Sequence, residues 1–148
     1  MRIALASDHA GFALKDELAA WLRDSGHVVI DLGTNSAESV DYPQFGAKLA
    51  AEVASGRAER GIAVCGSGIG ISIAINREPA CRCARVDDPL SAQLAREHND
   101  ANVLAFGARL IGHDMARACV TAFLGTNFAG GRHQRRVDQL SALLQDSD

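Results

Sequence analysis

The chain has 148 residues, of which 47% are hydrophobic and 22% charged, and its formal net charge is −3 at pH 7. These values are typical of one globular domain with an ordinary core, and the acidic balance argues against a general nucleic-acid or membrane-surface binder. No apolar run approaches the roughly 20 residues of a membrane span, and the N-terminus begins directly with a strand-like run rather than a signal peptide. We therefore expect a single domain over residues 1–148 and a cytoplasmic location.

Five short apolar runs, at 2–7, 28–32, 61–64, 81–86 and 102–106, have the character of buried strands. Between them, apolar residues recur at helical spacing. In the first helical segment Leu14, Leu18 and Trp21 form the apolar stripe, and Lys15 and Asp16 lie among the polar residues between them. Strands joined by helical crossovers form a parallel sheet with helices on both faces. The sequence therefore predicts an α/β fold with a parallel sheet of about five strands.

The end of the chain predicts one more helix. Gly130-Gly131 interrupts the helical pattern that precedes it. An amphipathic helix at about 131–145 then carries Val137, Leu140 and Leu144, and the tail 145–148 is expected to fray.

The most distinctive stretch is Cys65-Gly66-Ser67-Gly68-Ile69-Gly70, between the predicted strand at 61–64 and a helical run at 71–76. Its glycines allow backbone N–H groups to approach a ligand oxygen, and the next helix directs the positive end of its dipole to the same point. The loop is neither a Walker A sequence nor a G-x-G-x-x-G fingerprint. Ile71 occupies the place of the arginine that a tyrosine-phosphatase loop needs. The stretch is either an oxyanion-binding loop or a turn with only packing duties.

Open parallel sheets bind ligands at the carboxyl ends of their strands. The residues expected there are Asp8, His9, Cys65 to Gly70, Asp87, Asp88, Gly107 and Arg109. Cys65 stands before stacked N–H groups that favour a thiolate, so it is either a nucleophile or base, or an inert core thiol. The other cysteines, Cys81, Cys83 and Cys119, lack a paired metal-ligand spacing and are expected to act as small buried hydrophobes.

A histidine and a basic cluster lie further along the chain. His98 and Asn99 close the fourth helix, where a histidine either takes part in chemistry or complements the helix dipole. Arg132 and Arg136 are four residues apart and share a helical face, where they either bind a phosphate or are solvated. With the glycine loop, these groups indicate proton transfer beside a carbonyl of a phosphorylated small molecule, through an enediolate and without a metal or cofactor.

Several blocks in order carry a family resemblance: Ser-Asp-His-Ala-Gly at 7–11, Asp-Tyr-Pro at 41–43, the glycine loop at 65–70, the run at 91–104, Phe-Gly-Ala-Arg at 106–109 and Gly-Gly-Arg-His-Gln-Arg-Arg-Val at 130–137. The chain resembles the ribose/galactose isomerase family, which includes type B ribose-5-phosphate isomerases and galactose-6-phosphate isomerase subunits. The resemblance implies a Rossmann-like three-layer α/β/α sandwich. It also implies a homodimer or a dimer of dimers, with active sites shared between subunits, that interconverts an aldose phosphate and a ketose phosphate without metal.

Carried over residue by residue, the resemblance makes Cys65 the base that moves the proton between C1 and C2. Ser67 and His98 would assist opening of the furanose ring, with His98 as the proton donor. The substrate-binding residues that it implies are Asp8, His9, Tyr42, Gly66, Gly68, Ile69, Gly70, Asn99, Arg109, Arg132 and Arg136. In this set the loop N–H groups hold the enediolate oxygen, and Asp8 and Asn99 contact the sugar. The phosphate is held by His9, Arg132 and Arg136, with Arg109 lining the same pocket, and Tyr42 lies near the substrate.

One branch of the family uses a glutamate just after the glycine loop as its base, and Ile71 at that position assigns the role to Cys65 instead. The catalytic residues resemble the pentose enzyme most, which implies ribose 5-phosphate and ribulose 5-phosphate as the substrate pair in the pentose phosphate pathway. Three alternatives remain. They are an isomerase of erythrulose, allose or galactose phosphate; a sugar-phosphate sensor that needs neither Cys65 nor His98; and a thiol redox protein, which would lack a resolving cysteine near residue 65.

Overall fold

The computed structural model describes residues 1–143, which form five strands and six helices. The strands are β1 (Arg2–Ser7), β2 (Val28–Asp31), β3 (Arg60–Cys65), β4 (Cys83–Arg85) and β5 (Val103–Gly107). The helices are α1 (Phe12–Asp24), α2 (Tyr42–Ala54), α3 (Ile69–Ile75), α4 (Pro89–Asn99), α5 (His113–Leu124) and α6 (Arg132–Leu143). The five predicted strands are all present, and the fourth is shorter than the run expected at 81–86. The C-terminal helix matches the prediction up to residue 143, and Leu144 and the tail 145–148 lie outside the described residues.

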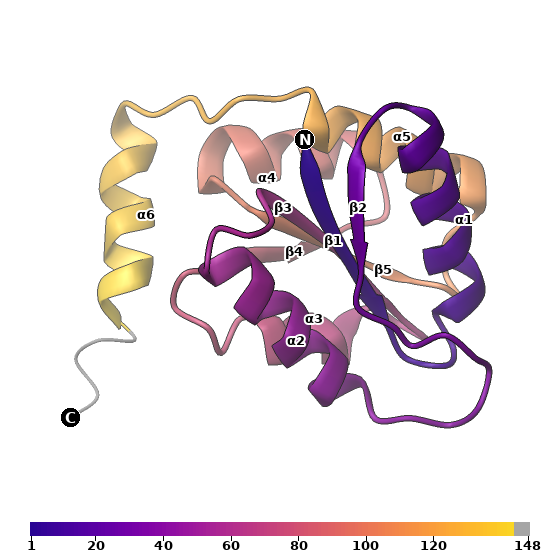
Figure 1. Ribbon diagram of the computed structural model, residues 1–148. Coiled ribbons are helices and arrows are strands. Elements are labelled where there is room, and N and C mark those ends of the chain that lie inside the picture. The colour runs from indigo at the N-terminus through magenta and orange to yellow at the C-terminus, as the bar shows by residue number, and fades with distance from the viewer. Residues whose placement is uncertain (144–148) are drawn as a thin grey trace.

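The strands form one parallel sheet in the order β2-β1-β3-β5-β4. Because side chains alternate along a strand, the sheet has two apolar faces. One face packs against α1, α4 and α5, and the other packs against α2 and α3. Figure 1 shows the sheet between these two helical layers. The predicted Rossmann-like three-layer α/β/α sandwich is therefore confirmed.

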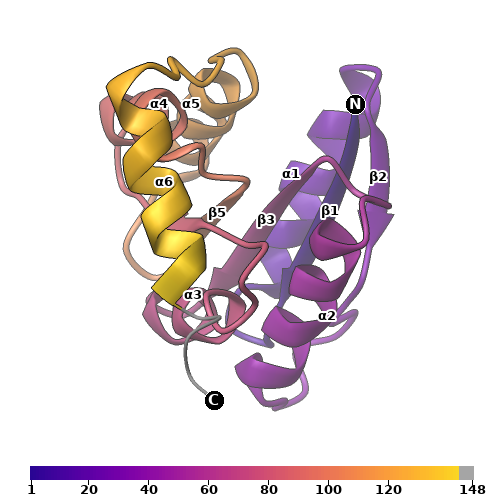
Figure 2. The same ribbon diagram turned by 90° about the vertical axis from the view of Figure 1, so that its left-hand side faces the viewer.

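The last helix stands apart from the two layers. In Figures 1 and 2, α6 lies beyond the β4 edge of the sheet and runs from the end of α4 toward α3. Val137 is the buried residue of α6, whereas Leu140 and Leu143 are exposed. A groove of about 440 Å³, lined by Leu140 and Ser141 of α6 and by residues such as Asn76, Cys83 and Asn99, separates α6 from the body. The single chain thus leaves most of the apolar face of α6 uncovered.

One expectation from the helical pattern is wrong. Lys15, placed among the polar residues of α1, has an exposed fraction of 0% because its ammonium group pairs with Asp31 inside the fold. None of the helices in the described part of the chain has the length and apolar character that crossing a bilayer requires.

Candidate active site

The sheet topology places a crevice between β1 and β3. After β1 the chain continues to β2, which lies on one side of the β1–β3 pair. After β3 it continues to β4 and β5, which lie on the other side. Neighbouring strands whose connections leave in opposite directions open a crevice at their carboxyl ends. A cavity of about 300 Å³ lies at these ends, and its lining consists of Asp8, Tyr42, Cys65, Gly66, Ser67, Gly70, Arg109 and Leu110. Seven of these eight residues belong to the set that the sequence predicts for the site.

Cys65 ends β3 and lies beside Gly107, the last residue of β5. The cysteine is a free thiol, and only 4% of its surface is exposed. Its Sγ accepts a hydrogen bond from the N–H of Gly68 over 3.1 Å. An N–H group that points at sulfur stabilises negative charge there. The thiol therefore lies at the cavity wall with a donor suited to its thiolate form.

The glycine loop fits closely between neighbouring groups. Gly68 has φ +76°, and a Cβ there would lie 2.7 Å from the carbonyl carbon of Phe106. A Cβ on Gly66 would lie 3.1 Å from a guanidinium nitrogen of Arg109, and one on Gly70 would lie 2.5 Å from the ring of Tyr42. Because Gly66 and Gly70 have no side chains, the Arg109 guanidinium and the Tyr42 ring pack directly against the loop backbone.

The loop after β1 contributes Asp8 and His9. Asp8 is 7% exposed, and its Oδ1 accepts a hydrogen bond from the N–H of Gly11 over 3.1 Å. The N–H of Val40 donates to Nδ1 of His9 over 3.1 Å. The same nitrogen lies 3.3 Å from the carbonyl oxygen of Val40, so either tautomer of the ring can form a hydrogen bond to this residue. His9 does not itself line the cavity, but it follows Asp8, and its ring is fixed to the loop that leads into Tyr42 and α2.

Four other predicted site residues lie at the opposite end of the strands, where the strands begin. His98 and Asn99 end α4, and β5 starts at Val103, four residues later. Because β5 then runs to the cavity at about 3.3 Å per residue, its two ends are roughly 15 Å apart. Arg132 and Arg136 lie on α6, whose start is joined to the end of α4 by a hydrogen bond from Ala129 to Glu97. Within the described chain these four residues do not line the cavity around Cys65.

At this end of the strands the basic and imidazole groups form a cluster of their own. The rings of His98 and His133 stack with centroids 4.4 Å apart. Desolvation lowers the pKa of His133, and the charges of His98, Arg132 and Arg136 lower it further. Arg96, also in α4, donates hydrogen bonds to the carbonyl oxygens of Thr126 and Ala101 and so ties this helix to the segments after α5 and before β5. The side chains of His98, Asn99, Arg132 and Arg136 are all exposed.

The remaining cysteines differ from Cys65. Cys81 and Cys119 are buried, and burial raises the pKa of each thiol to about 11. Burial also raises the pKa of Cys83. The prediction of buried core thiols is confirmed for Cys81 and Cys119, whereas Cys83 is only partly buried and lines the groove beside α6. Within residues 1–143 no three His, Cys, Asp or Glu side chains gather closely enough to hold a metal ion, and metal independence stays a prediction.

Sequence reasoning missed two features of this region. Leu110 lines the cavity, and the only signal for it is its position next to Arg109 after β5. The second feature is the ion pair between the fully buried Lys15 and the partly buried Asp31. The sequence shows only a lysine between Leu14 and Asp16, which the helical pattern assigns to the solvent.

The cavity, the thiol and the close-packed glycine loop define a class of protein. It is an α/β protein whose small-molecule cavity, at the carboxyl ends of the strands, is lined by a thiol, a carboxylate, a guanidinium group and a glycine-rich loop with a backbone donor. Comparison with known proteins gives the family.

The model of the Ribose/Galactose Isomerase family matches residues 3–140. Ribose-5-phosphate isomerase B of Escherichia coli is 48% identical over 144 residues, which cover 97% of each chain. The structure of ribose-5-phosphate isomerase B from Clostridium thermocellum has a TM-score of 0.99 at 47% identity and covers 100% of both chains. That of the Mycoplasma genitalium protein with bound ribulose-5-phosphate has a TM-score of 0.94 at 36% identity, covering 99% of this chain and 97% of that one. The chain belongs to the ribose/galactose isomerase family.

Proposed function

We propose that this chain, as one catalytic domain over residues 1–148, interconverts ribose 5-phosphate and ribulose 5-phosphate. The observation that carries the proposal is the Cys65 thiol at the cavity wall, with the Gly68 N–H directed at its sulfur. The relatives named ribose-5-phosphate isomerase B, and the Mycoplasma genitalium structure with bound ribulose-5-phosphate, support this substrate pair.

In the proposed reaction Cys65, as thiolate, removes the proton from C2 of the open-chain aldose. The electron pair moves to form the C1–C2 double bond, and the C1 oxygen takes up negative charge. The N–H groups of residues 66–70 stabilise that oxygen, as pre-oriented donors do in other enolising enzymes. The proton of the C2 hydroxyl passes to the C1 oxygen, the electron pair left on the C2 oxygen forms the C2 carbonyl, and C1 takes back the proton held by the thiol, which completes the ketose. No electron acceptor is required, because the redox change is internal to the substrate.

The other groups have proposed roles in binding and ring opening. Ser67, in the glycine loop, and His98, as proton donor, open the furanose ring. Asp8, Tyr42 and Asn99 contact the sugar. The phosphate is held by the basic residues His9, Arg109, Arg132 and Arg136, and the backbone of Gly66, Gly68, Ile69 and Gly70 completes the binding loop.

These roles need a second copy of the chain. Cys65 lies at the carboxyl edge of the sheet, whereas His98 lies at the amino edge. We propose a homodimer, or a pair of such dimers, in which each cavity receives His98, Asn99, Arg132 and Arg136 from the partner. The exposed apolar residues of α6, including Leu140 at 46% and Leu143 at 72%, support burial of this region against another copy. A closed two-fold dimer makes both sites equivalent.

The location of the enzyme is also a proposal. All four cysteines are free thiols. Free thiols that persist without pairing are typical of a reducing compartment. Together with a sugar-phosphate substrate, they support a cytoplasmic enzyme.

The first experiment is an isomerase assay on ribose 5-phosphate in the presence of a chelator. We expect turnover in the chelator and loss of turnover in Cys65→Ala, with substrate binding retained. Cys81→Ala is the matched control, because it removes an equally buried thiol outside the cavity. A panel of four- to six-carbon sugar phosphates separates ribose 5-phosphate from erythrulose, allose and galactose phosphates. A sensor would bind ligand without turnover in the wild type.

Shared sites are tested by complementation. Chains with Cys65→Ala and His98→Asn are co-expressed with different tags, and the mixed dimer is purified through both tags. In the shared arrangement one of the two sites is intact, so we expect about half of the wild-type activity per dimer. Each variant alone stays inactive. A mixed dimer as inactive as its parents would show that both residues act within one chain.

A further inference from the structure

Lys15 is a charged side chain in the middle of an apolar helix face. It follows Leu14 on α1, and none of its surface is exposed. Its Nζ donates to both carboxylate oxygens of Asp31, over 2.7 and 2.9 Å. It also lies 3.1 Å from Oδ1 of Asp16 and 3.5 Å from Oδ1 of Asn35. The ammonium group is thus surrounded by oxygen atoms from α1, β2 and the loop after β2.

Stability alone does not account for such a pair. Lys15 is fully buried and the Asp31 side chain is 22% exposed, so desolvation of the ammonium group and of much of the carboxylate offsets a large part of their attraction. An apolar pair of similar size is often as stable. Leu14 and Leu18 of α1 already supply the apolar face that packs on the sheet. A buried Lys–Asp pair does give direction, since each hydrogen bond holds a particular group in a particular place.

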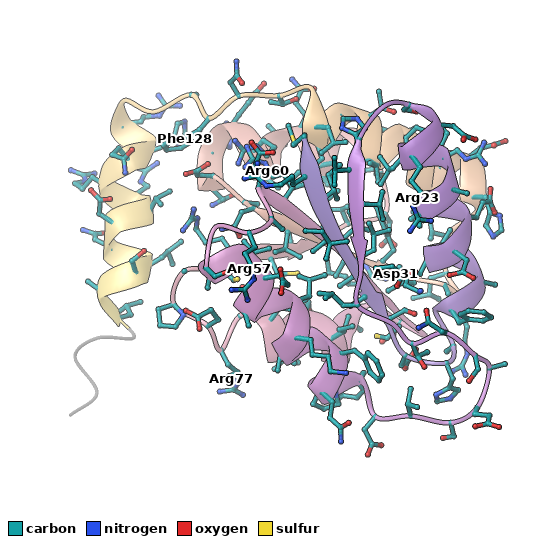
Figure 3. All side chains as sticks on the ribbon, viewed as in Figure 1. Arg23, Asp31, Arg57, Arg60, Arg77 and Phe128 are labelled. Carbon is teal, nitrogen blue, oxygen red and sulfur yellow. The ribbon has the colours of Figure 1, made fainter. Side chains whose placement is uncertain are left out.

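The pair holds the loop after β2 against the end of β1. Asp31 ends β2, and Figure 3 shows it between that strand and α1. Its Oδ1 accepts the N–H of Gly33 over 2.9 Å. The carbonyl of Gly33 accepts the N–H of Ser7 over 2.8 Å, and the N–H of Thr34 donates to the Ser7 carbonyl over 2.9 Å. Through these bonds the position of Ser7, the residue before Asp8, depends on the Lys15–Asp31 pair.

The same loop leads to the other substrate-binding groups. It contains Val40, whose N–H donates to the His9 ring, and it ends at Tyr42 on the cavity wall. The catalytic Cys65 belongs to β3, and its hydrogen bond comes from the glycine loop instead. The pair therefore acts on one side of the cavity and leaves the thiol on the other side untouched.

We propose that Lys15 is a positioning residue for the substrate, an inference that rests on the proposed isomerase function. Its ammonium group, through Asp31 and Asn35, fixes residues 33–41 on the end of β1. Asp8, His9 and Tyr42 then keep the places from which they bind the sugar phosphate.

The test compares Lys15→Met, Asp31→Asn and the double variant Lys15→Met/Asp31→Leu. We expect KM for ribose 5-phosphate to rise about tenfold in Lys15→Met, with kcat within about twofold of the wild type. Asp31→Asn, the conservative change, keeps an oxygen for both Lys15 and Gly33, so its KM rises by only about threefold. Arg117→Met is the control, because it removes an ion pair between α5 and Glu17 of α1 that forms no hydrogen bond to residues 33–41, and it should leave KM unchanged.

The double variant separates positioning from stability. An apolar pair restores the melting temperature that Lys15→Met loses through its unpaired carboxylate, but it does not restore KM. A folded double variant with the wild-type KM would overturn the proposal. If Lys15→Met fails to fold, the KM values of the double variant and of Asp31→Asn still test the positioning role of Lys15.

A second readout does not depend on turnover. In amide hydrogen exchange, segment 33–41 should exchange faster in Lys15→Met than in Arg117→Met, and segment 66–70 should not change. Unchanged exchange in 33–41 would refute the positioning role. A wild-type protein that fails to convert ribose 5-phosphate would refute the proposed function instead, and the exchange result would still decide whether Lys15 holds the loop.

Discussion

The close approach of the glycine loop to β5 gives a quantitative prediction for Gly68→Ala. Gly68 has φ +76°, a conformation that costs an L residue about 1–2 kcal/mol. The new Cβ would also lie 2.7 Å from the carbonyl carbon of Phe106 and 2.9 Å from the N of Gly107. Both atoms are main chain, so the loop or the strand must move, which typically adds 1–3 kcal/mol. We expect a loss of about 3 kcal/mol, or about 6–12 °C in Tm for a domain of this size.

Gly56→Ala is the matched control for this prediction. Gly56 has φ +79°, but nothing lies within 4 Å of its added Cβ, so the variant carries the conformational term without the crowding. The difference in unfolding free energy between the two variants, measured by urea titration, isolates the close approach. We also expect kcat of Gly68→Ala to fall by about 10²-fold, because the displaced N–H no longer faces Cys65. Equal stability losses in both variants, with kcat retained in Gly68→Ala, would refute this reasoning.

Three further predictions follow from the thiols, the imidazole cluster and the proposed dimer. Iodoacetamide at neutral pH should label Cys65 alone and abolish turnover, with protection by substrate, because burial raises the pKa of Cys81 and Cys119 to about 11 and also raises that of Cys83. Full activity after stoichiometric labelling of Cys65, read by mass spectrometry, would contradict its proposed role as base. The pKa of His133 is lowered in the folded chain, so its contribution to stability is present above its ordinary pKa of 6.5 and is lost as the pH falls below that value. The Tm of His133→Gln should therefore decline less between about pH 7 and 5 than that of the wild type, and parallel declines would argue against this. Activity per chain should fall on dilution through the dimer dissociation range, as followed by sedimentation, and a monomer with full activity would exclude shared sites.

The fold was predictable because its signals are local and repeated. Each strand is a short apolar run, and turn or capping residues such as Asp88, whose side chain accepts the N–H of Ser91, separate the elements. The order of the strands was not predictable, because the pairing of β4 with β5 rather than with β3 depends on long-range packing. The burial of Lys15 was missed for a related reason. Its partner Asp31 is 16 residues away, and a helical pattern contains no information about a distant carboxylate.

The part of the site around the glycine loop was predictable from the sequence. The three glycines of the loop at 65–70 predict that other groups pack closely against its backbone. In the structure these groups are the Phe106 backbone, the Arg109 guanidinium and the Tyr42 ring. The grouping of His98 with Cys65 came from the family resemblance. No spacing in the sequence indicates which edge of the sheet a residue occupies, so the separation of these two residues within one chain appears only in the structure.

That separation follows from the geometry of parallel sheets. All strands of a parallel sheet end on the same side, so Asp8 after β1 and Cys65 at the end of β3 line the same cavity. Every crossover helix runs back, so a residue in its last turn, such as His98 in α4, reaches the other edge. A base from a strand end and an acid from a helix end cannot face one substrate within a single layer of this kind. In the proposed dimer, a two-fold axis brings the end of α4 of one copy to the strand ends of the other copy. The proposed reaction therefore requires the dimer.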